Sequence, residues 1–197
     1  MRTLRGTTPV ESGCLDPNLN IFYTKTSDGR LYVMRQPRKK DKGAVKKALR
    51  KISNENWMRY ARVNIQDRWL YDINQRCSAP LYRSGFPGIL PLTVEVDGEI
   101  VGFSDGFFRL GVDFERYKVE PTDKCGNFSI VALDKLHGHG IGSYYAPTSN
   151  AIARHFGCKW ILGTTYMRGG MRGIRRREGW EIVEQYTNGT VAHRKLL

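Results

Sequence analysis

The chain has 197 residues, of which 40% are hydrophobic and 11% aromatic, a composition that favours one medium-sized globular domain and excludes a disordered chain. The formal net charge of +13 indicates an acidic partner, such as nucleic acid, a phosphorylated cofactor or an anionic surface, with solubility alone as the alternative. No apolar stretch approaches the roughly 20 residues of a membrane helix, and the N-terminal sequence lacks the apolar core of a secretion signal. The four cysteines form no CxxC pair, so we expect reduced thiols in a cytoplasmic protein.

The first half of the chain predicts strands followed by helices. Residues 1–19 are punctuated by glycine and proline, so we expect them to be irregular. Residues 20–37 indicate a β-hairpin, because Asp28-Gly29 is a two-residue turn signal between β-rich flanks. Apolar residues at helical spacing then predict helices over 45–52 and 57–69.

The second half alternates strands and helices. Residues 91–108 indicate a second hairpin around Asp97-Gly98, and the polar residues 109–124 stay unassigned. The segment GNFSIVALD, residues 126–134, is mostly apolar and is typical of a central strand. The remaining predicted elements are a helix over 140–157, a strand over 158–165, a helix over 166–179 and a hairpin over 179–197. This order predicts an α/β fold with a mixed sheet and a right-handed strand–helix–strand crossover.

A glycine-rich loop, LHGHGIGSYY at residues 136–145, lies between the predicted central strand and the following helix. Backbone N–H groups at a helix start have no partner inside the helix, and glycines let a phosphate approach them closely. A phosphate cradle and a tight turn without a ligand are both consistent with this loop. The spacing of Gly138, Gly140 and Gly142 is not that of a dinucleotide-binding fingerprint, and no Gly-Lys-Ser/Thr is present. His137 and His139 lack partners at ligand spacing, so we predict no metal site.

The loop and the order of elements resemble the GNAT superfamily of acyl-CoA-dependent N-acyltransferases. The pyrophosphate loop of that family reads R/Q-x-x-G-x-G/A, which the residues from His137 to Gly142 resemble, and Gly179-Trp180 resembles the glycine–aromatic pair after its last helix. The resemblance covers the chain from about residue 43 to the C-terminus. It implies a mixed, twisted sheet flanked by helices, with residues 1–40 as an added segment containing an N-terminal hairpin and 41–197 as the acyltransferase domain.

The resemblance also implies a cofactor, acetyl-CoA or another acyl-CoA, and a place for it. In the family two strands, here 127–133 and 158–163, splay apart, and the pantetheine arm of the cofactor lies between them. We expect the arm to hydrogen-bond the backbone around Ile130, Val131 and Ala132. The pyrophosphate would lie on the backbone amides of His137, Gly138, His139, Gly140, Ile141, Gly142 and Ser143. His137 stands where the family usually has Arg or Gln.

The acid and base of the reaction are less clearly marked. The family often has Asn and Tyr on its penultimate helix, where this chain has Arg168 and Arg175. Tyr166 and Tyr144 are therefore candidate proton donors, with packing in the core or at its rim as the alternative. Asp105 is the preferred candidate for the base that deprotonates the amine, with a solvated strand-end carboxylate as the alternative.

Basic residues gather in two runs, 38–51 and 168–177. In a GNAT-like fold the first helices border the acceptor groove, and a positive rim there implies an acidic acceptor such as nucleic acid or a protein bound to it. A solvated helix face is the alternative. The residues proposed to contact the acceptor are Arg38, Lys39, Lys40, Lys46, Lys47, Arg50, Arg168, Arg172 and Arg175.

Two hypotheses follow from these patterns. The first is an N-acetyltransferase that moves an acetyl group from acetyl-CoA to an amine of an acidic or nucleic-acid-associated acceptor. The second is a GNAT fold without catalysis that binds nucleic acid or serves in an assembly. A ligand that binds the folded state raises the melting temperature, so melting with and without acetyl-CoA separates the two.

Overall fold

The computed structural model of the chain describes residues 4, 6–53, 55, 72–83, 86–136, 139–166 and 178–197, without the side chains of Lys135 and Tyr166. The predicted helices over 57–69 and 166–179 lie wholly or largely outside these residues.

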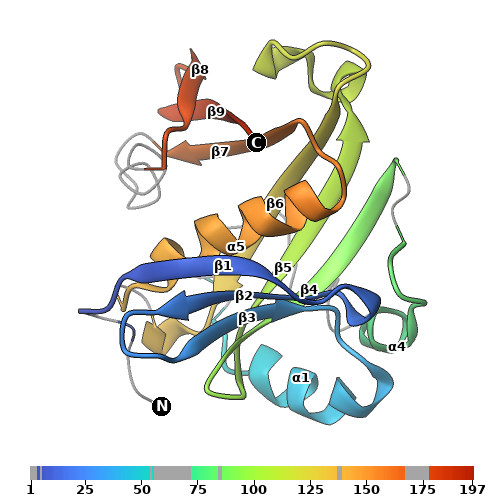
Figure 1. Cartoon of the computed structure of the whole chain (residues 1–197), viewed down its shortest axis with the longest axis vertical. Helices are drawn as coiled ribbons and strands as arrows, with labels where there is room; N and C mark the ends of the chain where they lie inside the picture. The colour runs from blue at the N-terminus through green and yellow to red at the C-terminus, as the bar shows by residue number, and fades with distance from the viewer. Residues whose placement is uncertain are drawn as a thin grey trace.

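The described residues form one nine-stranded sheet in the order β1-β2-β3-β4-β5-β6-β7-β9-β8 (Figure 1). Every neighbouring pair in it is antiparallel except β6 and β7, which are parallel. The strands are β1 Pro9–Asp16, β2 Ile21–Thr26, β3 Leu31–Arg35, β4 Gly88–Val96, β5 Glu99–Leu110, β6 Lys124–Ala132, β7 Trp160–Tyr166, β8 Glu181–Gln185 and β9 Thr190–Leu196. The described α-helices are α1 Lys42–Leu49, α4 Ile73–Ser78 and α5 Ile141–His155, and the 3-10 helices are η1 Pro17–Leu19, η2 Lys39–Asp41, η3 Gly111–Tyr117 and η4 Asp134–Leu136.

The predicted hairpins are confirmed, and so are the central strand, the helix after it and the strand that follows. Asp97 and Gly98 have φ values of 53° and 75°, which is the left-handed conformation that a tight two-residue hairpin turn requires. The β4–β5 hairpin is longer than predicted and runs to Leu110, after which η3 fills part of the unassigned segment.

The prediction that residues 1–19 are irregular is wrong, because residues 9–16 form β1. β1 pairs with β2 along its length and forms one edge of the sheet. Pro9 is its first residue, a place where the missing N–H of proline costs no ladder bond. Pairing with a neighbouring strand thus outweighs the local glycine and proline signals.

The helices cover both faces of the sheet. Phe108 of β5 packs on Phe156 at the end of α5, with ring centroids 5.1 Å apart. Asp105, an odd number of residues away on the same strand, contacts Arg76 of α4. Because side chains alternate between the faces of a strand, α5 lies on one face and α4 on the other. α1 contacts α4 and β5, whereas α5 contacts β1, β2, β6 and β7 (Figure 1).

The main hydrophobic core lies on both sides of the central strands and includes Phe22, Phe103, Phe108 and Phe156. A smaller cluster contains Tyr117, Cys125, Leu162 and Ala192, and it joins η3 to β6, β7 and β9. In the described part of the chain, no helix has the length and apolar character needed to cross a membrane.

Candidate functional site

The parallel strands β6 and β7 separate after a short ladder. They pair at Cys125–Trp160, Gly126–Ile161 and Asn127–Leu162. Beyond these pairs β6 continues beside β5 and β7 continues beside β9, and Figure 1 shows the two strands diverging with α5 lying across the angle. We call the lengths over which β6 and β7 no longer pair with each other, 128–132 of β6 and 163–166 of β7, the fork. Its presence agrees with the splayed strands that the sequence led us to expect.

A side chain closes the ladder at the branch point. Asn127 Nδ2 donates a hydrogen bond of 3.1 Å to the carbonyl oxygen of Leu162. Leu162 is the last residue of β7 that pairs with β6. The Asn127 amide therefore adds a side-chain hydrogen bond at the point where the strands part.

The direction of the backbone groups of β6 can be assigned residue by residue. Leu133 N donates to Val101 O of the β5 side at 2.9 Å, and backbone groups in an antiparallel ladder alternate in direction. With the unbroken register of β5 and β6, Val131 therefore points its N–H and C=O toward β5. Ile130 and Ala132 point theirs into the fork. Of the predicted residues Ile130, Val131 and Ala132, Val131 thus faces β5, and contact of the three with a cofactor stays a prediction.

The glycine loop leads from the end of β6 into α5. His137 and Gly138 lie outside the described residues. Gly140 is the N-cap of α5 with φ of +87°, a conformation that favours glycine. Because the cap residue is a glycine, no cap side chain occupies the amides of Ile141 and Gly142. A helix start of this kind suits an anion.

Two further groups of the loop are described. Ser143 N donates to Gly140 O at 3.1 Å, so this amide is already engaged in the first turn. His139 is half-buried, and its Nδ1 has no hydrogen-bond partner among the described atoms. Ser53 N donates to both carboxylate oxygens of Asp134 at 3.1 Å. This contact joins the segment after α1 to η4, directly before the loop.

Asp105 lies on the face of α1 and α4. It is 5% exposed, and its Oδ1 is 2.5 Å from Arg76 Nη1 of α4. This ion pair holds α4 against β5.

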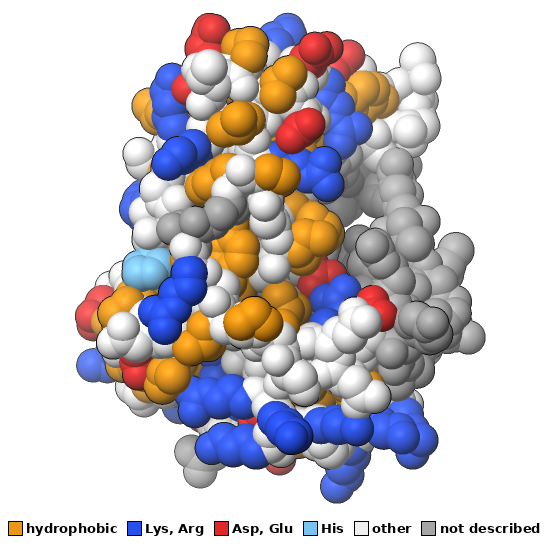
Figure 2. Space-filling view, turned by 90° about the vertical axis from the view of Figure 1, so that its right-hand side faces the viewer, with side chains coloured by type: hydrophobic (Ala, Val, Ile, Leu, Met, Phe, Trp, Pro, Cys, Tyr) orange, Lys and Arg blue, Asp and Glu red, His pale blue; other side chains and the backbone are white. Residues whose placement is uncertain are grey.

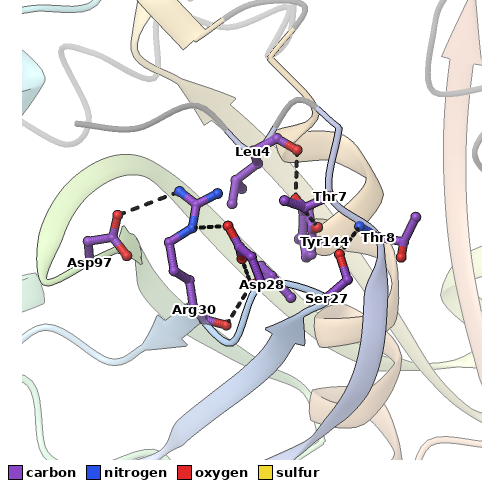
Figure 3. A network of polar contacts seen from close by, with 9 residues as sticks. Leu4, Thr7, Thr8, Ser27, Asp28, Arg30, Asp97 and Tyr144 are labelled. Carbon is purple, nitrogen blue, oxygen red and sulfur yellow. Dashed lines mark hydrogen bonds and ion pairs between the residues drawn. The ribbon is translucent and has the colours of Figure 1, made fainter.

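Tyr144 lies in the first turn of α5 and faces the N-terminal segment. It is fully buried, and its ring stacks on Tyr32 of β3 with centroids 5.9 Å apart. Figure 3 shows its hydroxyl beside Thr7. Since the Thr7 hydroxyl donates to Leu4 O at 2.7 Å, Tyr144 donates to Thr7. Burial raises the pKa of Tyr144, so the phenol keeps its proton at neutral pH. The structure does not bring Tyr144 and Asp105 together.

The third predicted residue, Tyr166, ends β7, and its side chain is outside the described atoms. A tyrosine that the sequence did not indicate lies beside the fork instead. Tyr117 of η3 is fully buried, and its hydroxyl is 2.9 Å from the Oγ1 of Thr164. Thr164 is an exposed residue of β7 two positions beyond the branch point. Arg116 Nη2 donates to the same phenol oxygen at 3.3 Å.

The first basic run lies on η2 and α1. Lys39, Lys40, Lys46, Lys47 and Arg50 are exposed, and Arg38 is half-buried. Figure 2 shows Lys and Arg side chains gathered along the lower edge of the molecule, where Figure 1 places α1. We call these six residues the basic surface. Arg168, Arg172 and Arg175 lie outside the described residues.

No protein-family model and no curated protein matches the sequence. Solved structures do match the fold. The GNAT domain of PAT from S. lividans is 16% identical, with a TM-score of 0.62 over 86% of this chain and 93% of that one. RimJ from Mycobacterium smegmatis, in complex with CoA-disulfide, is 11% identical, with a TM-score of 0.58 over 84% and 82%. A putative acetyltransferase, yncA from Salmonella typhimurium, with acetyl-CoA, is 15% identical, with a TM-score of 0.51 over 84% and 94%.

The chain therefore has the GNAT fold, as the sequence led us to expect. At these identities the likeness concerns the fold alone.

Proposed function

We propose that the protein is an acyl-CoA-dependent N-acyltransferase with acetyl-CoA as its donor. The observation that carries the proposal is the fork, an unpaired strand edge inside a sheet, next to a helix that starts at a glycine cap. An extended arm with amide groups can pair with such an edge, and its phosphates can lie at the helix start. The presence of CoA compounds in two structures of the same fold supports this reading.

In this proposal each part of the site has one role. Bound acetyl-CoA supplies the acetyl group as a thioester. The amides of Ile141 and Gly142 hold its pyrophosphate, and the edge groups of Ile130 hold its arm. The linked hydroxyls of Tyr117 and Thr164 are placed beside the fork to give a proton to the leaving thiolate.

Asp105 stays our predicted base. Replacing it with Asn should lower kcat and leave CoA affinity unchanged. Weakened CoA binding in that variant would instead indicate a role in holding the site together.

The first test of the proposal is a thermal melt with and without acetyl-CoA. A ligand at 100 times its Kd stabilises a folded protein by about 2.7 kcal/mol, so we expect a clear rise in Tm. Transfer of a labelled acetyl group to an amine, followed by mass spectrometry of the product, then tests catalysis. An unchanged Tm at millimolar acetyl-CoA would reject the proposal and favour the fold without catalysis.

For the acceptor, we propose an amine carried by an acidic molecule, because the basic surface borders the segment before the glycine loop. Binding of a short DNA duplex, measured by fluorescence anisotropy, should fall steeply as salt rises. A double variant, Lys46→Glu with Lys47→Glu, should weaken DNA binding while the Tm shift with acetyl-CoA is retained. No detectable binding of the wild type at low salt would reject a nucleic-acid acceptor.

A further inference from the structure

A buried amide on α5 is left without a hydrogen bond. Asn150 is 3% exposed, and its Oδ1 has no partner in the part of the chain that the structure describes. A buried polar atom without a partner costs about 1–3 kcal/mol, so buried side chains of this kind usually have one. The position of Asn150 in the fold indicates which group could supply the missing hydrogen bond.

Its neighbours on the helix fix the direction in which Asn150 leans. Ala153 lies over β6, since its Cβ is 3.5 Å from a Cβ placed on Gly126. Phe156, three residues later, packs on Phe108 of β5. Three residues correspond to a turn of about 60° around the helix. Asn150, three residues before Ala153, turns by the same angle to the other side, which is the side of β7.

Asn150 also lies at the level of the branch point. α5 runs back along β6, because it connects the parallel strands β6 and β7. Asn150 is about 4.5 Å from Ala153 along the helix axis. The same length measured along β6 from Gly126, at about 3.3 Å per residue, ends between Asn127 and Phe128. These are the last paired and the first unpaired residues of the strand.

The next residue of β7 on this face of the sheet is a glycine. Ile161 is paired with Gly126, and a Cβ added to Gly126 would contact Ala153, so both residues face α5. Alternation along the strand therefore puts Gly163 on the side of α5, and Gly163 has no side chain. Asn150 thus lies on the same face of the sheet as Gly163, at the level of the closed end of the fork.

We propose that Asn150 hydrogen-bonds an amide of the pantetheine arm of CoA. This inference rests on the proposed function. The arm carries secondary amides, each with one donor and one acceptor, and the carboxamide of Asn can both donate and accept. Asn150 is about 12 Å along the helix from Gly142, so the amide it binds is far from the phosphates and near the thioester.

The test compares CoA with adenosine 3′-phosphate 5′-diphosphate, the nucleotide half of CoA, by isothermal titration calorimetry. Asn150→Ala and Asn150→Leu should each bind CoA about tenfold more weakly. Both should bind the nucleotide half like the wild type. Unchanged CoA affinity, or equal weakening for both ligands, would overturn the inference while leaving the proposed function intact. A wild type that binds neither ligand would overturn both.

Two further measurements separate binding from structure. Asn150→Leu should not lower the Tm of the free protein, because no hydrogen bond of Oδ1 is lost and an apolar side chain is buried instead. Ser149→Ala is the matched control, since Ser149 is 2% exposed and its Oγ is also without a partner in the described structure. Ser149 is turned by about 100° from Asn150 around the helix, away from the side of β7, so its replacement should leave CoA affinity unchanged. Equal losses in the Ser149 and Asn150 variants would contradict a directed contact.

Discussion

The two sides of α5 differ in how their buried polar groups are satisfied. On the side of the N-terminal strands, Thr148 is hydrogen-bonded to Thr24 at 2.6 Å and to Tyr144 O at 2.7 Å, and Tyr144 is bonded to Thr7. On the side of the fork, the oxygen of Asn150 has no partner among the described groups. A satisfied polar group stabilises the fold, whereas an unsatisfied one costs stability unless a ligand supplies the bond. Thr148 thus helps to hold the fold together, whereas Asn150 keeps an acceptor that a ligand could use.

The largest effect is expected where α5 begins. Gly140→Val forces a β-branched residue into a left-handed conformation. It also puts a side chain at the start of α5, where the pyrophosphate is proposed to bind. The acetyl-CoA-induced rise in Tm should disappear. The matched control is Gly29→Val, because Gly29 has nearly the same φ, +84°, in an exposed hairpin turn with nothing within 4 Å of an added Cβ. The control should lose similar stability and keep its response to acetyl-CoA. An equal Tm response of the two variants to acetyl-CoA would contradict pyrophosphate binding at the start of α5.

The next effect concerns the side of α5 that holds the fold. Thr148→Val keeps the shape of the side chain but leaves the buried hydroxyl of Thr24 unpaired. We expect a loss of about 2 kcal/mol in the free energy of unfolding, measured by urea denaturation, with no change in CoA affinity. A weakened CoA affinity without loss of stability would reverse the assignment of the two sides.

A smaller effect is expected at the branch point. Asn127→Ala removes the bond to Leu162 O and should cost about 1 kcal/mol. Faster hydrogen exchange should appear in the first residues of β7, with β4 and β5 unaffected. Uniform acceleration over the whole sheet would show that the ladder does not depend on this side chain.

The smallest expected effect concerns Asp41, which is not part of α5, and it depends on pH. Burial raises the pKa of Asp41, but hydrogen bonds from Arg35, at 2.6 Å, and from Arg38 N, at 2.7 Å, outweigh it and lower the pKa. The stabilisation from Asp41 is therefore present above the unfolded value, about 3.9, and is lost as the pH falls through the folded value. Asp41→Asn should cost up to about 1 kcal/mol at pH 7. A difference from the wild type that stays constant down to pH 3 would exclude this ion pair as the cause.

Local signals in the sequence predicted the elements that depend on local chemistry. The turn residues Asp28-Gly29 and Asp97-Gly98 mark hairpins wherever they occur, and apolar spacing marks α1 and α5. β1 was missed because it exists through pairing with β2, which no local pattern encodes. The glycine loop could be recognised in the sequence because the backbone conformation at a helix start favours glycine locally.

Contacts between distant residues were beyond the sequence. The pairs Arg76–Asp105 and Tyr117–Thr164 join residues 29 and 47 positions apart. The Tyr144 hydroxyl is buried and hydrogen-bonded to Thr7, which distinguishes it from a hydroxyl that could take part in a reaction. The sequence shows neither property. A signal for Asn150 was present, since it is a polar residue beside the alanines at 146 and 153 of an amphipathic helix. The role of Asn150 could be inferred only after the structure showed that β7 lies on the side toward which this residue turns.

The position of the unpaired edge of β6 has a consequence for solubility. Open strand edges at the border of a sheet invite pairing with other chains and so lead to aggregation. Here the edge that β6 turns away from β5, at Ile130, lies in the middle of the sheet rather than at its border. Strands on both sides therefore keep a second copy of the protein from laying a strand beside it.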